Sequence, residues 1–199
     1  MNVIIVGATG TIGRAVAKEI GKRHRIISVA SKHGDYQVDI TDVKSIENMY
    51  KEVGKFDALI ATAGKMHLAE FSAMNAQMYH VGLMDKLMGQ VNLVLIGCKY
   101  INDQGSFTLT SGKLSFDPVR GGSSGSMVNA AVDGFVIGAA IEMPRGIRIN
   151  AVSPTILAES AHQYGHFFPG FEPVESSRVA LAYSKSVEGS QNGQIYHVG

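Results

Sequence analysis

The chain has 199 residues, of which 45% are hydrophobic and 18% are charged, and these fractions are those of an ordinary globular protein. Its length suffices for one domain with a full core and leaves little room for a second. The formal net charge of +1 and the absence of Lys/Arg runs give no indication of nucleic acid or a membrane surface as a partner.

The N-terminal segment predicts a cytoplasmic chain. Its apolar run covers only residues 3–6 and stops at Gly7, which is too short for a signal peptide. No segment reaches the roughly 18–20 apolar residues that a membrane span needs. The single cysteine, Cys98, cannot form an internal disulfide and gives no sign of an oxidising compartment.

Strand-like and helix-like segments alternate along the whole chain. The first part predicts a strand at 3–6, a helix at 11–22, strands at 26–30 and 36–40, a helix from Asp42 to about 53, and a strand at 56–61. The rest predicts helices at 72–79 and 81–101, a strand at 107–110, a helix at 123–142, and strands at 147–152 and 194–198. Repeated βα units imply a doubly wound parallel sheet of about seven strands in a three-layer α/β/α arrangement. Since no repeat or linker interrupts the pattern, residues 1–199 are expected to form one domain.

A glycine-rich turn follows the first predicted strand and opens the first predicted helix; its sequence at residues 7–13 is GATGTIG. Gly7 permits the tight turn, Gly10 lets the backbone approach a pyrophosphate, and Gly13 allows the helix to pack closely on the strand. Free N–H groups at the start of the helix attract phosphates. The turn therefore predicts a Rossmann-type dinucleotide site. The cofactor contacts expected from it are Gly7, Thr9, Gly10, Thr11, Ile12 and Gly13.

The end of the second predicted strand bears on the choice of cofactor. An acidic residue that binds the ribose is the usual sign of NAD selectivity, and none follows Ala30. Ser31 and Lys32 stand there instead, and with Arg14 nearby they could bind a 2′-phosphate. The sequence therefore favours NADP(H) over NAD(H).

Five segments together resemble the short-chain dehydrogenase/reductase family over nearly the full length of the chain. They are GATGTIG at 7–13, VDIT at 38–41, ATAG at 61–64, TLTSG at 108–112 and NAVSP at 150–154, although Thr155 stands where the family usually has glycine. The resemblance implies an NAD(P)(H)-dependent oxidoreductase acting on a small carbonyl or alcohol. It also implies further cofactor contacts at Asp39, Ile40, Ala63, Gly64 and Pro154.

The resemblance breaks at the catalytic residues. In the family a serine polarises the substrate carbonyl and a tyrosine exchanges the proton. A lysine one helical turn after the tyrosine lowers its pKa and holds the ribose, and an asparagine on the preceding long helix completes a water relay. Here the tyrosine position is Gly125, the lysine position is Asn129, and the asparagine position is Lys86, so that only Ser111 remains.

Lysine and asparagine have thus exchanged places between neighbouring helices. On one interpretation the site keeps one cation and one amide, and Lys86 reaches it from the other wall to bind the ribose or to lower the pKa of a nearby acid. On the other, Lys86 is a solvated helix lysine and Asn129 has lost its role. The first interpretation makes Ser111, Lys86 and Asn129 the catalytic candidates.

Without the tyrosine, several groups could supply the proton that the developing alkoxide needs. Lys86 is one if burial lowers its pKa, and a water relayed by Ser111 and Lys86 is another. A third source is Tyr164 or His166 in the segment 156–175, which is the expected substrate loop. The serines at 123–126 are expected to cap the following helix.

Two functions remain open at this point: an oxidoreductase with a non-standard active site, and a catalytically inactive NADP(H)-binding sensor or regulatory protein. An isomerase that uses bound cofactor without net redox change is a weaker third. No Cys/His cluster indicates a metal. Methionines along the middle helices suggest a subunit contact, and the family resemblance implies a homodimer or homotetramer.

Overall fold

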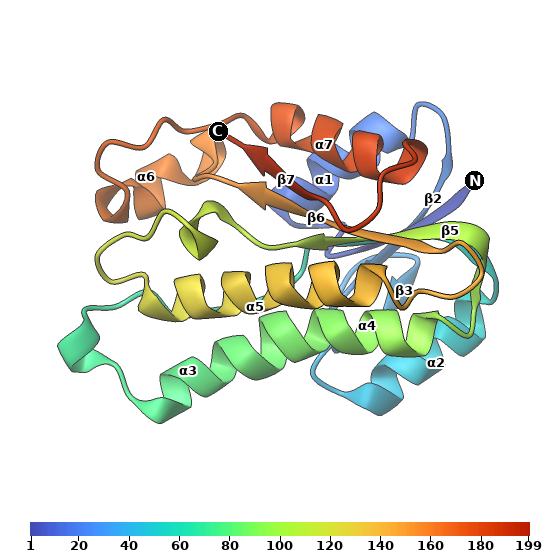
Figure 1. The fold of residues 1–199 in the computed structure, drawn as a ribbon, viewed down its shortest axis with the longest axis horizontal. Helices are drawn as coiled ribbons and strands as arrows, with labels where there is room; N and C mark the ends of the chain where they lie inside the picture. Colours follow the sequence, from blue (N-terminus) through green and yellow to red (C-terminus); the bar gives the residue numbers. More distant parts are fainter.

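The computed structural model describes all 199 residues and arranges them around one seven-stranded sheet (Figure 1). All its strand pairs are parallel, in the order β3-β2-β1-β4-β5-β6-β7. The strands are β1 (Asn2–Val6), β2 (Arg25–Ala30), β3 (Tyr36–Gln37), β4 (Phe56–Ala61), β5 (Ile101–Thr110), β6 (Arg148–Pro154) and β7 (Ile195–Val198). The order reverses between β1 and β4, where doubly wound sheets bind ligands at the carboxyl ends of their strands. The predicted Rossmann-type fold is confirmed.

Helices cover both faces of the sheet: α1 and α7 lie over one face, and α2, α4 and α5 over the other (Figure 1). Their bounds are α1 (Thr11–Ile20), α2 (Val43–Val53), α3 (Ala76–Gly82), α4 (Gly89–Gly97), α5 (Ser123–Ala140), α6 (Ala161–Tyr164) and α7 (Ser176–Glu188). Alternate residues of β1 enter opposite cores, since Ile4 and Val6 pack with α2, α4 and α5 while Val3 and Ile5 pack with α1 and α7. This two-sided burial explains the continuous apolar strands of the sequence. No helix is long and apolar enough to cross a membrane.

The end of α4 and the start of β5 differ from the prediction. The predicted helix at 81–101 is wrong at its end, because α4 stops at Gly97 and β5 already begins at Ile101. Residues 102–104 of β5 are polar, and this is why the sequence pattern did not indicate a strand there. Asn102 is satisfied there by donating from Nδ2 to Asp57 Oδ1 at 2.7 Å.

The middle helices form one almost continuous run rather than two helices. After a 3₁₀ turn at Phe71–Ala73, α3 leads into a π-helical turn at Leu83–Met88, which leads into α4. π-helical turns are rare and are frequently found at functional sites. Lys86 lies in this one.

Helix α7 was not among the predicted elements. Its buried residues Val179, Ala180, Tyr183 and Val187 have helical spacing and pack on the sheet. The Tyr183 hydroxyl lies 2.6 Å from Thr110 Oγ1. The many serines of the segment obscured this apolar stripe.

The predicted serine cap of α5 is wrong. The N-cap residue is Gly122, and no side chain caps the helix. The Ser123 hydroxyl lies 2.7 Å from the Tyr79 hydroxyl, and the buried hydroxyls of Ser124 and Ser126 have no partner in the protein. These serines occupy the first turn of α5, and none of their side chains caps the free N–H groups of the helix.

Candidate functional site

The glycine-rich turn connects β1 to α1 in the conformation that the sequence predicted. Gly7 has a φ of +88°, which favours glycine, and its N–H donates to Val29 O at 2.8 Å. A Cβ at Gly13 would lie 2.1 Å from Gly7 O, so only glycine lets the helix start this close to the turn. The N-cap Gly10 supplies no side-chain cap. The first N–H groups of α1 are therefore available to an anionic ligand.

A cavity of about 270 Å³ lies beside this turn at the carboxyl ends of β1, β2 and β4. Asp39 lines it and accepts hydrogen bonds from Thr41 N at 2.9 Å and Thr41 Oγ1 at 2.7 Å. These bonds lower the pKa of Asp39 and keep its carboxylate ionised. The predicted cofactor residues in this adenosine-side cavity are Gly7, Thr9, Gly10, Ser31, Asp39, Ile40, Ala63 and Gly64.

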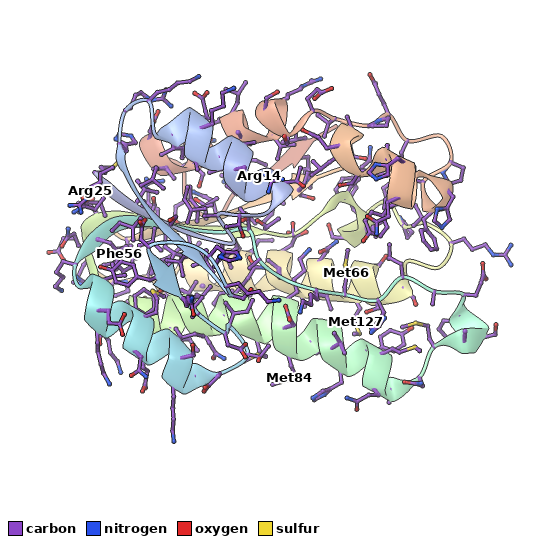
Figure 2. The ribbon with its side chains drawn as sticks, turned by 180° about the vertical axis from the view of Figure 1, so that it is seen from behind. Arg14, Arg25, Phe56, Met66, Met84 and Met127 are labelled. Carbon is purple, nitrogen blue, oxygen red and sulfur yellow. The ribbon has the colours of Figure 1, made fainter.

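Six predicted cofactor residues lie outside it. Ile12 and Pro154 line the second cavity, described below, and Gly13 lies where α1 packs on the turn. The other three are Lys32, Thr11 and Arg14. Lys32 is exposed and does not line the cavity. Thr11 and Arg14 border a separate cleft between α1 and the start of α7, and the Arg14 guanidinium donates to Thr9 O. Figure 2 shows Arg14 on α1. The predicted contacts of these three residues with a cofactor therefore have no support in this cavity.

A larger cavity, of about 520 Å³, adjoins the first at the carboxyl ends of β4, β5 and β6. Ile12 and Pro154 line it, as do all three catalytic candidates. The lid segment, which we define as residues 156–175, closes one side with Tyr164, Phe167 and Phe168. His166 does not line the cavity; its ring packs on Phe167 with the centroids 4.0 Å apart.

Lys86 is buried at the wall of this catalytic cavity, with 7% of its surface exposed. Its Nζ donates to Asn129 Oδ1 at 2.6 Å and to Ser111 O at 2.9 Å. Burial lowers the pKa of Lys86 to about 8, and the Asp133 carboxylate only partly opposes this shift. Lys86 is therefore not a solvated helix lysine, and the side chains of the exchanged lysine and asparagine meet.

Close backbone approach holds Lys86 in place. A Cβ at Gly64 would lie 2.6 Å from Lys86 Cγ, so the segment after β4 approaches the π-helical turn this closely only because residue 64 is glycine. Gln90, fully buried one turn later, donates from Nε2 to Lys86 O at 3.2 Å and to Thr110 O at 3.0 Å. It also accepts from Thr110 N at 2.8 Å. Sequence reasoning missed Gln90, whose signal is a polar residue in a predominantly apolar helix.

Ser111 follows the last residue of β5 and is 3% exposed. Its main-chain N–H donates to Val152 O at 3.0 Å. Its hydroxyl has no partner in the protein, and the residue lines the catalytic cavity. Buried hydroxyls are normally hydrogen-bonded, so this one is available to a ligand.

The space beside Gly125 is filled by sulfur and hydrocarbon. A Cβ there would lie 3.0 Å from Leu114 Cδ1 and 3.1 Å from Met66 Sδ. Figure 2 shows Met66 next to the first turns of α5. The third atom near that position is Met66 Cε, at 3.5 Å, so none of the three nearest atoms is a hydroxyl.

Comparison with known proteins identifies the family of the chain. The family model described as enoyl-(acyl carrier protein) reductase matches residues 6–197. The crystal structure of the protein lin1944 from Listeria innocua is 45% identical, with a TM-score of 0.98 over the whole of both chains. A small-chain dehydrogenase in complex with NADPH is 26% identical, with a TM-score of 0.88 over 100% of this chain and 96% of that one. No curated protein matches in sequence. Because the family match runs through almost every element of the sheet, the chain belongs to the short-chain dehydrogenase/reductase family.

Proposed function

We propose that the protein is an NADP(H)-dependent oxidoreductase, built as one dinucleotide-binding domain, that interconverts a small carbonyl compound and its alcohol. The observation that carries this proposal is the buried Lys86 ammonium, bonded to Asn129 Oδ1 at 2.6 Å at the wall of the cavity that contains Ser111. Family membership supports a nicotinamide cofactor, as does the relative in complex with NADPH.

The two adjoining cavities fit such a cofactor. The N–H groups at the start of α1 would hold the pyrophosphate, and Ser31 and Asp39 would border the adenosine. Ala63, Gly64 and Pro154 would border the nicotinamide half. No carboxylate follows β2, and the Ser31 hydroxyl leaves room for a 2′-phosphate, which favours NADP(H). When bound, the cofactor supplies or accepts the hydride.

The chain's own residues would handle the oxygen and its proton. The Ser111 hydroxyl would donate to the carbonyl oxygen of the substrate. An ammonium has three N–H donors, and two of those of Lys86 have protein acceptors, so the third can point to the same oxygen. With a pKa of about 8, Lys86 can release and regain a proton near neutral pH. Asn129 would hold the ammonium in position.

The direct test is a fluorescence titration of the protein with NADPH and with NADH. The cofactor that binds more tightly is then assayed for oxidation in the presence of a panel of small ketones and aldehydes. We expect tighter binding of NADPH and its oxidation by at least one class of carbonyl compound. Tighter binding of NADH would contradict the cofactor preference.

A second candidate is an NADP(H)-binding regulatory protein without turnover. The observation in its favour is that Met66 and Leu114 fill the space beside Gly125, where the family's proton donor would lie. Tight NADPH binding with no oxidation across the whole panel would support it and would count against the oxidoreductase.

A further inference from the structure

The charged side chains that line the catalytic cavity are all basic. Four basic side chains line it, and no aspartate or glutamate does; the basic residues are Lys65, His67, Lys86 and Lys113. Much of the rest is apolar, formed by Met66, Leu68, Leu114, Leu157, Phe167 and Phe168. Such a lining favours a ligand with an apolar body and a negative group.

Lys113 is the cation best placed for that group. It lies two residues after Ser111, so their Cα atoms are at most about 7 Å apart. Its side chain is 22% exposed, and its nearest carboxylate, Asp117 Oδ2, lies 3.7 Å from Nζ on a side chain that is 49% exposed. A separation of 3.7 Å is longer than a charge-assisted hydrogen bond. The ammonium is therefore only weakly neutralised.

Lys113 itself lines the catalytic cavity and not the adenosine-side cavity, whereas its other neighbours, Phe171 and Gly199, line neither. Nζ lies 5.2 Å from the centroid of the Phe171 ring in the lid segment, and it donates to Gly199 O, beyond β7, at 3.3 Å. None of these residues lines the adenosine-side cavity. The phosphates of a dinucleotide would bind at the start of α1, so they leave Lys113 for a group on the substrate.

We infer, on the basis of the proposed function, that the substrate is an oxo carboxylic acid whose carboxylate pairs with Lys113. Its apolar chain packs against Met66, Leu114 and Phe168. Reduction adds a hydride to the carbonyl carbon and a proton to its oxygen, gives the hydroxy acid, and leaves the carboxylate unchanged. Of the two further lysines, Lys65 also lines the adenosine-side cavity, which leaves Lys113 as the one ammonium confined to the catalytic cavity beside Lys86, and one ammonium matches a monoanion. No arginine, the side chain suited to bidentate phosphate binding, lines the cavity.

The experiment compares α-ketoisocaproate with its methyl ester as substrates of the NADPH-loaded protein. These probes share the carbonyl and the apolar chain and differ in the negative charge. We expect kcat/KM for the acid to exceed that for the ester by about tenfold or more, the size of one charge-assisted hydrogen bond. Lys113→Gln should raise KM for the acid by about tenfold and leave the ester unchanged. Lys113→Arg should retain the preference, and Lys51→Gln on the exposed surface of α2 is the matched control.

An ester that is used as well as the acid would overturn the inference, as would a Lys113→Gln variant that affects both equally. If neither probe is turned over, binding of the acid to the NADP⁺-loaded protein is measured by calorimetry. Binding that Lys113→Gln abolishes would support the ligand class although the oxidoreductase fails. Absence of binding would overturn the inference.

Discussion

At the scale of single residues, the chemistry centres on a buried cation whose hydrogen-bond partners are both neutral. Lys86 Nζ is bonded to an amide oxygen and a main-chain carbonyl, and no carboxylate pairs with it directly. Burial removes the hydration of this ammonium, and the Asp133 carboxylate offsets the loss only in part, so the pKa of Lys86 is lowered. The ammonium is destabilised in the free protein and is ready to stabilise an oxyanion or to give up its proton.

The pH dependence of turnover follows from this pKa. Carbonyl reduction requires the protonated ammonium, so kcat/KM should fall as pH rises through about 8, and alcohol oxidation should rise over the same range. Asn129→Asp puts a carboxylate where the amide oxygen now lies 2.6 Å from Nζ, which favours the ammonium. Its midpoint should move upward by about one pH unit or more. If the pH midpoint of kcat/KM were the same in the wild type and in Asn129→Asp, Lys86 would not be the group that transfers the proton.

The burial of Lys86 should also make the free energy of unfolding of the cofactor-free protein depend on pH. Because the folded pKa of about 8 lies below the ordinary value of 10.5, the unfolded chain binds more protons between these limits, and the free energy of unfolding rises with pH there. Relative to Lys86→Met, the wild type should gain about 2 kcal/mol between about pH 8 and about pH 10. Urea unfolding of both proteins at several pH values measures this gain. If the difference in free energy of unfolding between the wild type and Lys86→Met did not change with pH, Lys86 would not be desolvated.

At the scale of elements, the π-helical turn and Gln90 join the α3–α4 run to the end of β5. Gln90 satisfies both the N–H and the carbonyl oxygen of Thr110, next to Ser111. Sequence reasoning could place Lys86 on a helix but could not show the π-helical turn. Its geometry depends on contacts such as that between Gly64 and Lys86, which lie far apart in the chain. Helix α7 was missed for a different reason: its apolar residues have helical spacing, but the serines between them obscured the pattern.

Removal of the Gln90 bridge should cost more than removal of an ordinary surface amide. Gln90→Leu leaves the buried N–H and carbonyl oxygen of Thr110 without these partners, which should lower the free energy of unfolding by about 2–4 kcal/mol. Gln77→Leu, at an exposed position of α3, is the control and should change it by less than about 0.5 kcal/mol. If denaturant unfolding showed that Gln90→Leu and Gln77→Leu lower the free energy of unfolding equally, the hydrogen bonds of Gln90 would not stabilise the fold.

At the scale of the whole molecule, parallel strand ends bring together residues that are distant in the chain. Lys86, Ser111 and Asn129 come from separate segments and meet at one edge of the sheet. The alternation of strands and helices was sufficient to predict that edge and the glycine turn. It was not sufficient for Lys113 or for the orientation of the lid, because neither follows from periodicity. Arg14 and Lys32 lie near the predicted site in sequence but do not line the adenosine-side cavity, and their contact with a cofactor stays a prediction.

Exposed apolar side chains on α4, on α5 and just after α5 bear on the predicted homodimer or homotetramer, and we propose that they form a dimer interface. Leu95 is 58% exposed, Ile137 57% and Ile141 88%, and such a group of exposed apolar side chains is typical of an interface. We expect a dimer in sedimentation analysis and a monomer after Ile137→Glu, since a charge would be buried. Leu181→Glu, on the other face of the sheet, should leave the dimer intact. A monomeric wild type would contradict this assignment.

The central claim is that Lys86 performs the proton chemistry that the family assigns to the absent tyrosine, and the turnover of Lys86→Met tests it most directly. Methionine preserves the length and apolar body of the side chain and removes the ammonium. With NADPH and an active carbonyl substrate, kcat should fall by about 100-fold or more while the protein still folds and binds NADPH. A Lys86→Met variant with the turnover rate of the wild type would contradict the account.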